Sequence, residues 1–115
     1  LGSLSGCCGR QTSRARATQV RVQVLDEATR DLAAGYRFYE RQAEGLGEYF
    51  LDSLWSDINS LRLYAGVHAL HHGYHRLLSK RFPYAVYYRI DDRAARVRAV
   101  LDCRRDPEWI EDRLN

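Results

Sequence analysis

The spacing of apolar side chains along the chain changes twice, and each change predicts a different kind of element. Near the start, Val20, Val22 and Val24 alternate with polar residues. This period of two predicts a strand with one buried face. The period then becomes that of a helix for about 40 residues and returns to two in the last third of the chain. The pattern predicts a strand, then helices, then a run of strands.

Two apolar stripes define the helical part. Asp26 stands where a helix N-cap belongs, and Gly66 is a plausible end. Within each stripe the apolar residues follow one another at steps of three or four positions, as they do along one face of an α-helix. Because only the short segment Gly45–Gly47 separates the stripes, we expect two antiparallel helices whose aromatic residues belong to the core. The stripes are Ala28, Leu32, Tyr36, Tyr39 and Ala43, and then Phe50, Leu54, Ile58, Leu61 and Ala65.

Three strands follow, predicted at residues 74–80, 82–90 and 95–103, with Asp91 and Asp92 in the last turn. In the third strand we expect Val97, Ala99, Leu101 and Cys103 on one face and Arg96, Arg98, Val100 and Asp102 on the other. Pro107 suits the first turn of a C-terminal helix at residues 108–114. The predicted class is α+β, in the order β-α-α-β-β-β-(α), with an antiparallel sheet packed against a helical hairpin.

Charge divides the chain into regions. The formal charge of +3 equals the three arginines of residues 1–19, so residues 20–115 are neutral. Residues 26–60 carry eight acids against three bases, whereas residues 71–105 carry nine bases against three acids. The basic residues are seventeen arginines and one lysine, Lys80, and arginine is the better residue for bidentate contacts with phosphate or carboxylate. An acidic hairpin against an arginine-rich sheet fits a domain held by a partner better than a general nucleic-acid binder.

Composition restricts the class of protein. The 115 residues suit one domain, and no apolar run approaches the length of a membrane span. Three cysteines form no disulfide or metal-binding framework, so we expect a reduced cytoplasmic protein. Residues 1–19 lack periodicity and are predicted to be a disordered basic tail or an extension of the gene start. Residues 20–115 are the predicted folded domain.

Three segments resemble the RelE/ParE family of bacterial toxins, many of which are known as plasmid stabilization proteins. Gly73–Ile90 (GYHRLLSKRFPYAVYYRI) is similar to its central strands, and Arg104–Trp109 (RRDPEW) to the segment that closes its sheet. Residues 43–50 resemble the G-L-G-x-x-F connection between its two helices. The resemblance covers residues 20–112. It implies the toxin of a type II toxin–antitoxin pair, which inhibits growth and is neutralised by a cognate antitoxin.

The family includes two activities. ParE-like members bind DNA gyrase, whereas RelE-like members cut mRNA on the ribosome with clustered basic residues. Ala85 follows Tyr84 where ribonucleases commonly have arginine, and the C-terminal helix offers Trp109 in place of a tyrosine. These departures favour gyrase-type inhibition; an mRNA endoribonuclease and an inactive antitoxin-binding domain stay open. In a ribonuclease the catalytic residues would be Arg76, Arg81, Arg104 and Arg105. In either case Arg76, Lys80, Arg81, Arg98, Arg104, Arg105 and Trp109 are the candidates for binding target or antitoxin.

The arginines also have a purely structural interpretation, and four histidines form a second cluster. The arginines could form a solvated sheet face or pair with acids of the helices. His68, His71, His72 and His75 run from a loop into a strand, so their side chains are not expected to converge on a metal. His75 is the best histidine candidate for a general acid or base because of its strand position. We expect no metal or other cofactor.

Overall fold

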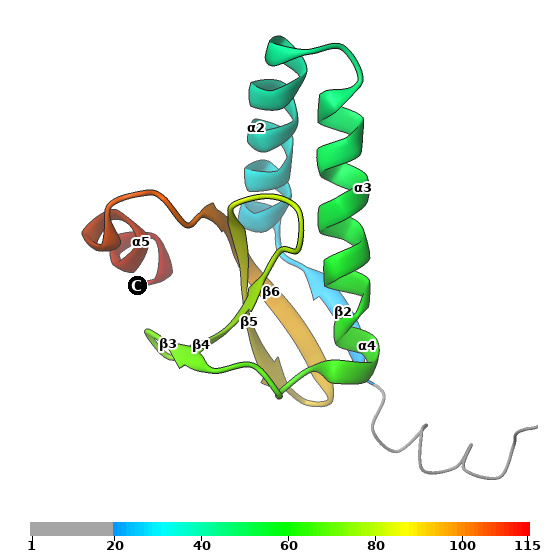
Figure 1. The fold of residues 1–115 in the computed structure, drawn as a ribbon. Coiled ribbons are helices and arrows are strands. Elements are labelled where there is room, and N and C mark those ends of the chain that lie inside the picture. The colour runs from blue at the N-terminus through cyan, green and yellow to red at the C-terminus, as the bar shows by residue number, and fades with distance from the viewer. Residues whose placement is uncertain (1–19) are drawn as a thin grey trace, which may run out of the picture.

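The computed structural model describes residues 20–115, and the predictions for residues 1–19 lie outside this range. Figure 1 shows a helical hairpin on one side of a sheet and the C-terminal helix on the other. The elements are β2 (Arg21–Val24), α2 (Asp26–Gln42), α3 (Leu46–Asn59), α4 (Leu61–Tyr64), β3 (Leu70–His71), β4 (Tyr74–Leu78), β5 (Tyr84–Asp91), β6 (Ala94–Asp102) and α5 (Pro107–Leu114).

The described residues form a five-stranded sheet in the order β2-β6-β5-β4-β3. The first strand, β2, pairs in parallel with β6, and the other neighbours are antiparallel. A parallel pair needs a crossover connection, and here the helical hairpin supplies part of it. The predicted α+β class is therefore confirmed, with the hairpin on one face of a largely antiparallel sheet.

The core between the hairpin and the sheet contains most of the two predicted stripes. Tyr39, Phe50, Leu54, Ile58 and Leu61 are buried there, together with Val86 and Tyr88 of β5. The prediction fails at Tyr36 and Ala43, which are half-buried and exposed. Gly35 is buried in their place, and a Cβ there would lie 2.5 Å from the Phe50 ring. A glycine thus lets α2 and α3 approach each other closely.

A β-bulge reverses the faces of β6. Tyr87 lies opposite Ala99 but Tyr88 lies opposite Val97, so Arg98 has no partner of its own in the ladder. An extra residue moves every later side chain to the other face of the sheet. Val97 therefore packs under the hairpin, and Ala99 packs toward α5. The prediction that Val97, Ala99, Leu101 and Cys103 share one face is wrong for this reason; Leu101 packs toward α5, and Val100 joins the hairpin core.

Local features account for the smaller differences. Asp26 is the first residue of α2 and Leu25 is its cap, so the predicted N-cap is wrong by one position. An extra short strand, β3, pairs with β4 through a turn in which His72 and Gly73 have φ of 57° and 82°. Two left-handed residues are typical of tight hairpin turns. The second predicted helix continues past Ser60 only as the one-turn α4, and Gly66 has the left-handed φ expected beyond a helix end.

Candidate functional site

The seven predicted binding residues lie in separate parts of the structure. Arg105 and Trp109 line a cleft formed by α2, β6 and α5, and Arg104 is bound to Asp102, which also lines it. Arg76 lies on β4, whereas Lys80 and Arg81 lie in the loop between β4 and β5, beside α3. The last of the seven is Arg98, at the bulge of β6. The sheet thus divides the basic residues instead of gathering them in one cluster.

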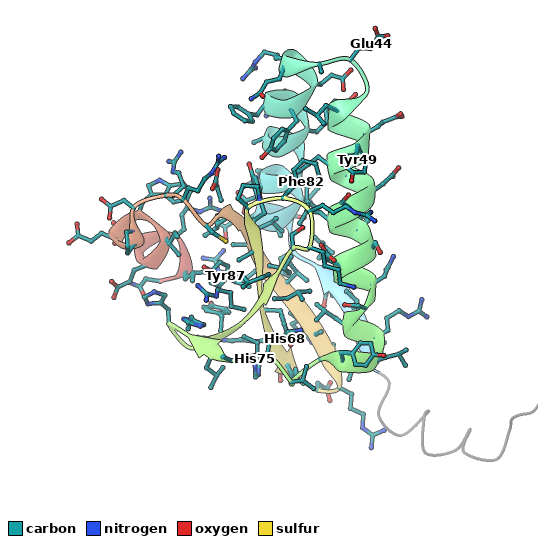
Figure 2. The ribbon with its side chains drawn as sticks, in the orientation of Figure 1. Glu44, Tyr49, His68, His75, Phe82 and Tyr87 are labelled. Carbon is teal, nitrogen blue, oxygen red and sulfur yellow. The ribbon has the colours of Figure 1, made fainter. Side chains whose placement is uncertain are left out.

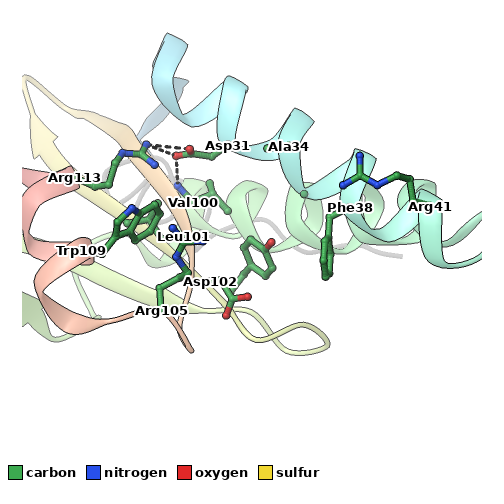
Figure 3. A pocket seen from close by; sticks show the side chains of 12 residues that line it. Asp31, Ala34, Phe38, Arg41, Val100, Leu101, Asp102, Arg105, Trp109 and Arg113 are labelled. Carbon is green, nitrogen blue, oxygen red and sulfur yellow. Dashed lines mark hydrogen bonds and ion pairs between the residues drawn. The ribbon is translucent and has the colours of Figure 1, made fainter.

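The α2–β6–α5 cleft has a volume of about 400 Å³ (Figure 3). Phe38 and Arg41 of α2 face Arg105 and Trp109 across it, and Asp102 of β6 lies between them. Phe38 is 42% exposed, which leaves an aromatic ring open to a partner. Aromatic and arginine side chains are the residues that contribute most at protein interfaces. The cleft therefore has the composition of a binding surface.

One carboxylate holds the walls of this cleft together. Both oxygens of Asp31 on α2 accept hydrogen bonds from Nη2 of Arg113 on α5, at 2.9 and 2.8 Å. The Oδ2 atom also accepts the backbone N–H of Val100 on β6, at 3.1 Å. A charge-assisted contact of this kind is stronger than a neutral one. Asp31 thus fixes α5 against α2 and β6.

Arg104 is fully engaged by its neighbour Asp102. Its Nε and Nη2 donate to the two carboxylate oxygens at 3.0 and 2.8 Å, and its backbone N–H donates at 2.8 Å. Hydrogen bonding from Arg104 lowers the pKa of Asp102. Burial raises the pKa of the adjacent Tyr84 to about 12, so its phenol stays protonated at neutral pH. Arg104 is therefore a cation already paired with a carboxylate, and the neighbouring Tyr84 phenol is protonated.

Arg105 lies over the ring of Trp109, with its guanidinium carbon 3.8 Å from the ring centroid. Among residues 20–115, neither Arg105 nor Arg41 has a carboxylate within ion-pair distance. A guanidinium stacked on an aromatic face keeps its N–H groups available to a second partner. Arg41 and Arg105 therefore provide the unpaired positive charge of the cleft.

Arg76 lies near Tyr87, its neighbour across the ladder between β4 and β5. Burial raises the pKa of Tyr87, and the Arg76 guanidinium offsets part of that rise. Tyr87 belongs to the second core, with Ala99, Leu101 and Ile110, on the α5 side of the sheet. Arg76 is thus separated by the sheet from Lys80 and Arg81, and the four predicted catalytic arginines do not converge on one point.

Arg98 pairs with Glu27 in the first turn of α2. This contact agrees with the alternative in which arginines of the sheet pair with acidic residues of the helices.

In the loop between β4 and β5, the guanidinium carbon of Arg81 lies 5.8 Å from the ring centroid of Tyr49 on α3. Figure 2 shows Tyr49 close to Phe82 of the same loop, and their ring centroids are 5.5 Å apart.

The histidines contribute to the structure around a buried tyrosine. Nδ1 of His68 lies 2.5 Å from the hydroxyl of Tyr88, which also accepts the backbone N–H of Gly66 at 2.9 Å. His75 stacks on Tyr88. Its Nδ1 lies 2.7 Å from the carbonyl oxygen of His68, and Figure 2 shows these two histidines near each other. Burial, and then the nearby His75, lower the pKa of His68. In the described part of the chain, no group of three or more histidine, cysteine or acidic residues is placed to hold a metal.

Sequence reasoning missed several residues of the cleft: Asp31, Phe38, Arg41 and Arg113. Phe38 lies outside the apolar stripe of α2. This position in the sequence is the one signal that marks it as an aromatic residue on the surface. The other three look like ordinary surface charges of amphipathic helices. Their role depends on contacts across the fold, which leave no local pattern.

The fold places this chain in the class of small α+β domains with a helical hairpin on a largely antiparallel sheet. No protein-family model matches the sequence, and no curated protein matches it. A solved structure described as "Chromosomal ParDE TA system from P. aeruginosa" contains a chain of similar fold, with a TM-score of 0.61 and 17% sequence identity. The match covers 72% of this chain and 95% of that one, so the two share a fold over most of their length. Within residues 20–115, no helix combines the length and apolar character needed to cross a bilayer.

Proposed function

We propose that this chain is the toxin of a type II toxin–antitoxin module and acts in the cytoplasm as ParE-like toxins do, by binding an essential target such as DNA gyrase. The observation that carries the proposal is the fold shared with a chain of a ParDE toxin–antitoxin system. The α2–β6–α5 cleft supports a role in binding, because its open aromatic ring and unpaired arginines suit contact with another protein.

The arrangement of arginines favours this binding role over mRNA cleavage. A nuclease of this kind needs several cations around one phosphate. Here Arg104 is paired with Asp102, and Arg81 lies beside α3 while Arg76 lies on the other side of the sheet. Burial also keeps the pKa of Tyr84 and Tyr87 high, so neither phenol is a good base.

We further propose that the cognate antitoxin places an acidic segment in the α2–β6–α5 cleft. Arg41 and Arg105 would receive its carboxylates, and Phe38 and Trp109 would pack against its apolar side chains. Complementary charge of this kind speeds association and sets the register of the partner. Of the seven candidate residues predicted from the sequence, this proposal uses Arg105 and Trp109.

Induced expression tests the proposal. With the chain expressed alone, growth should stop, and DNA replication should fail before translation. Purified protein should inhibit gyrase supercoiling and leave mRNA intact on ribosomes. Co-expression of the cognate antitoxin, for which a small gene beside this one in the genome is the first candidate, should restore growth. Cleaved mRNA would establish the ribonuclease alternative instead. Normal growth together with tight binding to the neighbouring gene product would identify an inactive antitoxin-binding domain.

A further inference from the structure

A second, smaller cavity lies on the opposite side of the molecule, between α3 and the loop that joins β4 to β5. Its volume is about 120 Å³, and its lining residues are Ser53, Ser56, Asp57, Lys80 and Arg81. Water occupies about 30 Å³ per molecule in the liquid, so the space would hold about four waters or one small organic molecule.

The inner wall of this cavity consists of buried polar groups that lack partners. Ser53 and Asp57 lie one helical turn apart on α3 and are only 6% and 7% exposed. The Ser53 hydroxyl and the Oδ2 atom of Asp57 have no hydrogen-bond partner anywhere in residues 20–115. Buried polar groups are nearly always satisfied, and an unsatisfied carboxylate oxygen is especially costly. In the structure these two atoms have no partner among the described residues, so they can bind polar groups of a ligand.

The mouth of the cavity has the opposite charge. Lys80 and Arg81 are exposed, and neither has a carboxylate within 4.0 Å among the described residues. The loop that carries them is fixed to the hairpin by Phe82, whose ring centroid lies 5.1 Å from that of Phe50 and 4.9 Å from that of Tyr39. The loop backbone is therefore held near the mouth of the cavity, where Lys80 is exposed and the Arg81 guanidinium lies beside the Tyr49 ring.

This polarity disfavours simple ions. An anion would meet the two cations but would be repelled by Asp57, and a cation would meet Asp57 but would be repelled by Lys80 and Arg81. A ligand with an ammonium group at one end and a carboxylate at the other satisfies both walls. We propose that the cavity between α3 and the β4–β5 loop is a binding site for a small zwitterion of the α-amino acid class.

In this site the ammonium group donates to Asp57 and Ser53, and the carboxylate accepts from Lys80 and Arg81. The proposal does not depend on toxin activity, because it concerns a surface away from the α2–β6–α5 cleft. A ligand of about six heavy atoms cannot bind tightly, and we expect a Kd of about 1 mM.

The test uses the full chain labelled with ¹⁵N and titrated with glycine, L-alanine and L-serine. We expect saturable shifts of the Ser53, Asp57 and Lys80 amide signals. Acetate and methylammonium, each carrying one half of the zwitterion, should produce no saturable shift at the same concentrations. Equal responses to either half-ligand, or no saturable response to any amino acid, would overturn the proposal and leave a cavity that holds solvent only.

Variants place the binding at these residues. Asp57→Asn should weaken binding at least about tenfold, because it removes the charge that faces the ammonium group. Lys80→Gln changes an exposed residue and should weaken binding several-fold without affecting folding, which keeps the test decisive if the Asp57 variant unfolds. The matched control is Asp52→Asn, an exposed carboxylate on the same helix that does not line the cavity. If Lys80→Gln binds as tightly as the unchanged protein, the assigned orientation is wrong.

Discussion

Arg113 and Asp31 are 82 positions apart in the sequence, yet one guanidinium nitrogen of Arg113 donates to both carboxylate oxygens of Asp31. Their side chains are 27% and 13% exposed, so the pair is largely shielded from water. Because Asp31 also accepts the N–H of Val100, this one carboxylate fixes the helix α5 against the hairpin and the sheet. The shape of the α2–β6–α5 cleft depends on this contact.

Replacing Asp31 should therefore loosen α5. We expect Asp31→Asn to lower the free energy of unfolding by about 1–3 kcal/mol, because it leaves Arg113 without its charged partner. Urea unfolding followed by circular dichroism measures this change. The control is Asp112→Asn, an exposed acid on α5 with no ion pair among the described residues. A loss no larger than that of the control would contradict the role of the pair.

The proposed antitoxin contact predicts a specific effect of Arg105. Replacing it with alanine removes one unpaired cation of the cleft, and association with the antitoxin should slow roughly threefold at low salt. The salt dependence of the rate should become shallower as well. Stopped-flow mixing at two ionic strengths measures both. Arg62→Ala, an exposed arginine on α4, changes the net charge equally and should have a smaller effect. Equal effects would indicate general attraction and no defined contact.

The contact between His68 and Tyr88 predicts how stability depends on pH. The pKa of His68 is lowered in the folded protein, so folding favours the neutral ring. Its contribution to stability is complete above the unfolded pKa of about 6.5 and declines as the pH falls through that value and on through the lower folded pKa. Asparagine at this position keeps an acceptor for the Tyr88 hydroxyl but does not titrate.

Unfolding free energies measured between pH 7.5 and pH 5.5 test this prediction. The loss of stability toward low pH should be smaller in His68→Asn than in the unchanged protein, by the part that His68 contributes. His72→Asn, at an exposed histidine, is the matched control for the replacement of one histidine by asparagine. If His68→Asn and the unchanged protein lose the same stability, His68 does not titrate differently in the folded state.

Gly35 predicts a steric effect in the hairpin. Alanine is a better helix former than glycine by about 1 kcal/mol, but its Cβ would lie 2.5 Å from two atoms of the Phe50 ring. The clash should outweigh the gain, and Gly35→Ala should destabilise the fold by about 1–3 kcal/mol. Thermal unfolding measures the change. Adding Phe50→Leu should relieve part of the clash, so the double variant should lose less stability than the two single variants lose in total. A loss equal to or larger than that total would refute this explanation.

Much of the fold could be predicted because it follows from local patterns. The stripe that contains Leu54 and Ile58 is buried as expected, and Pro107 begins α5, where the Asp106 carboxylate accepts the N–H of Glu108. The faces of β6 could not be predicted. The bulge at Arg98 is set by the register between β5 and β6, which the alternation of apolar and polar residues in β6 does not encode.

The candidate site shows the same division. Arg105 and Trp109 were predicted from a short motif, and they do lie together in the cleft. The motif could not show that Asp102 engages Arg104, or that the sheet separates Arg76 from Lys80. Each of these outcomes depends on how strands and loops from different parts of the chain are placed in the fold.

The sequence by itself determined the α+β class, most of the elements and most of the hairpin core, because apolar periodicity and turn residues act over a few positions along the chain. Only the tertiary structure decided which charges remain free. Ion pairs such as Arg113 with Asp31 form between residues far apart in sequence, and the strength of each depends on burial and distance. The predicted basic residues are therefore divided between one cleft with two unpaired arginines and a separate loop beside α3 with two more cations.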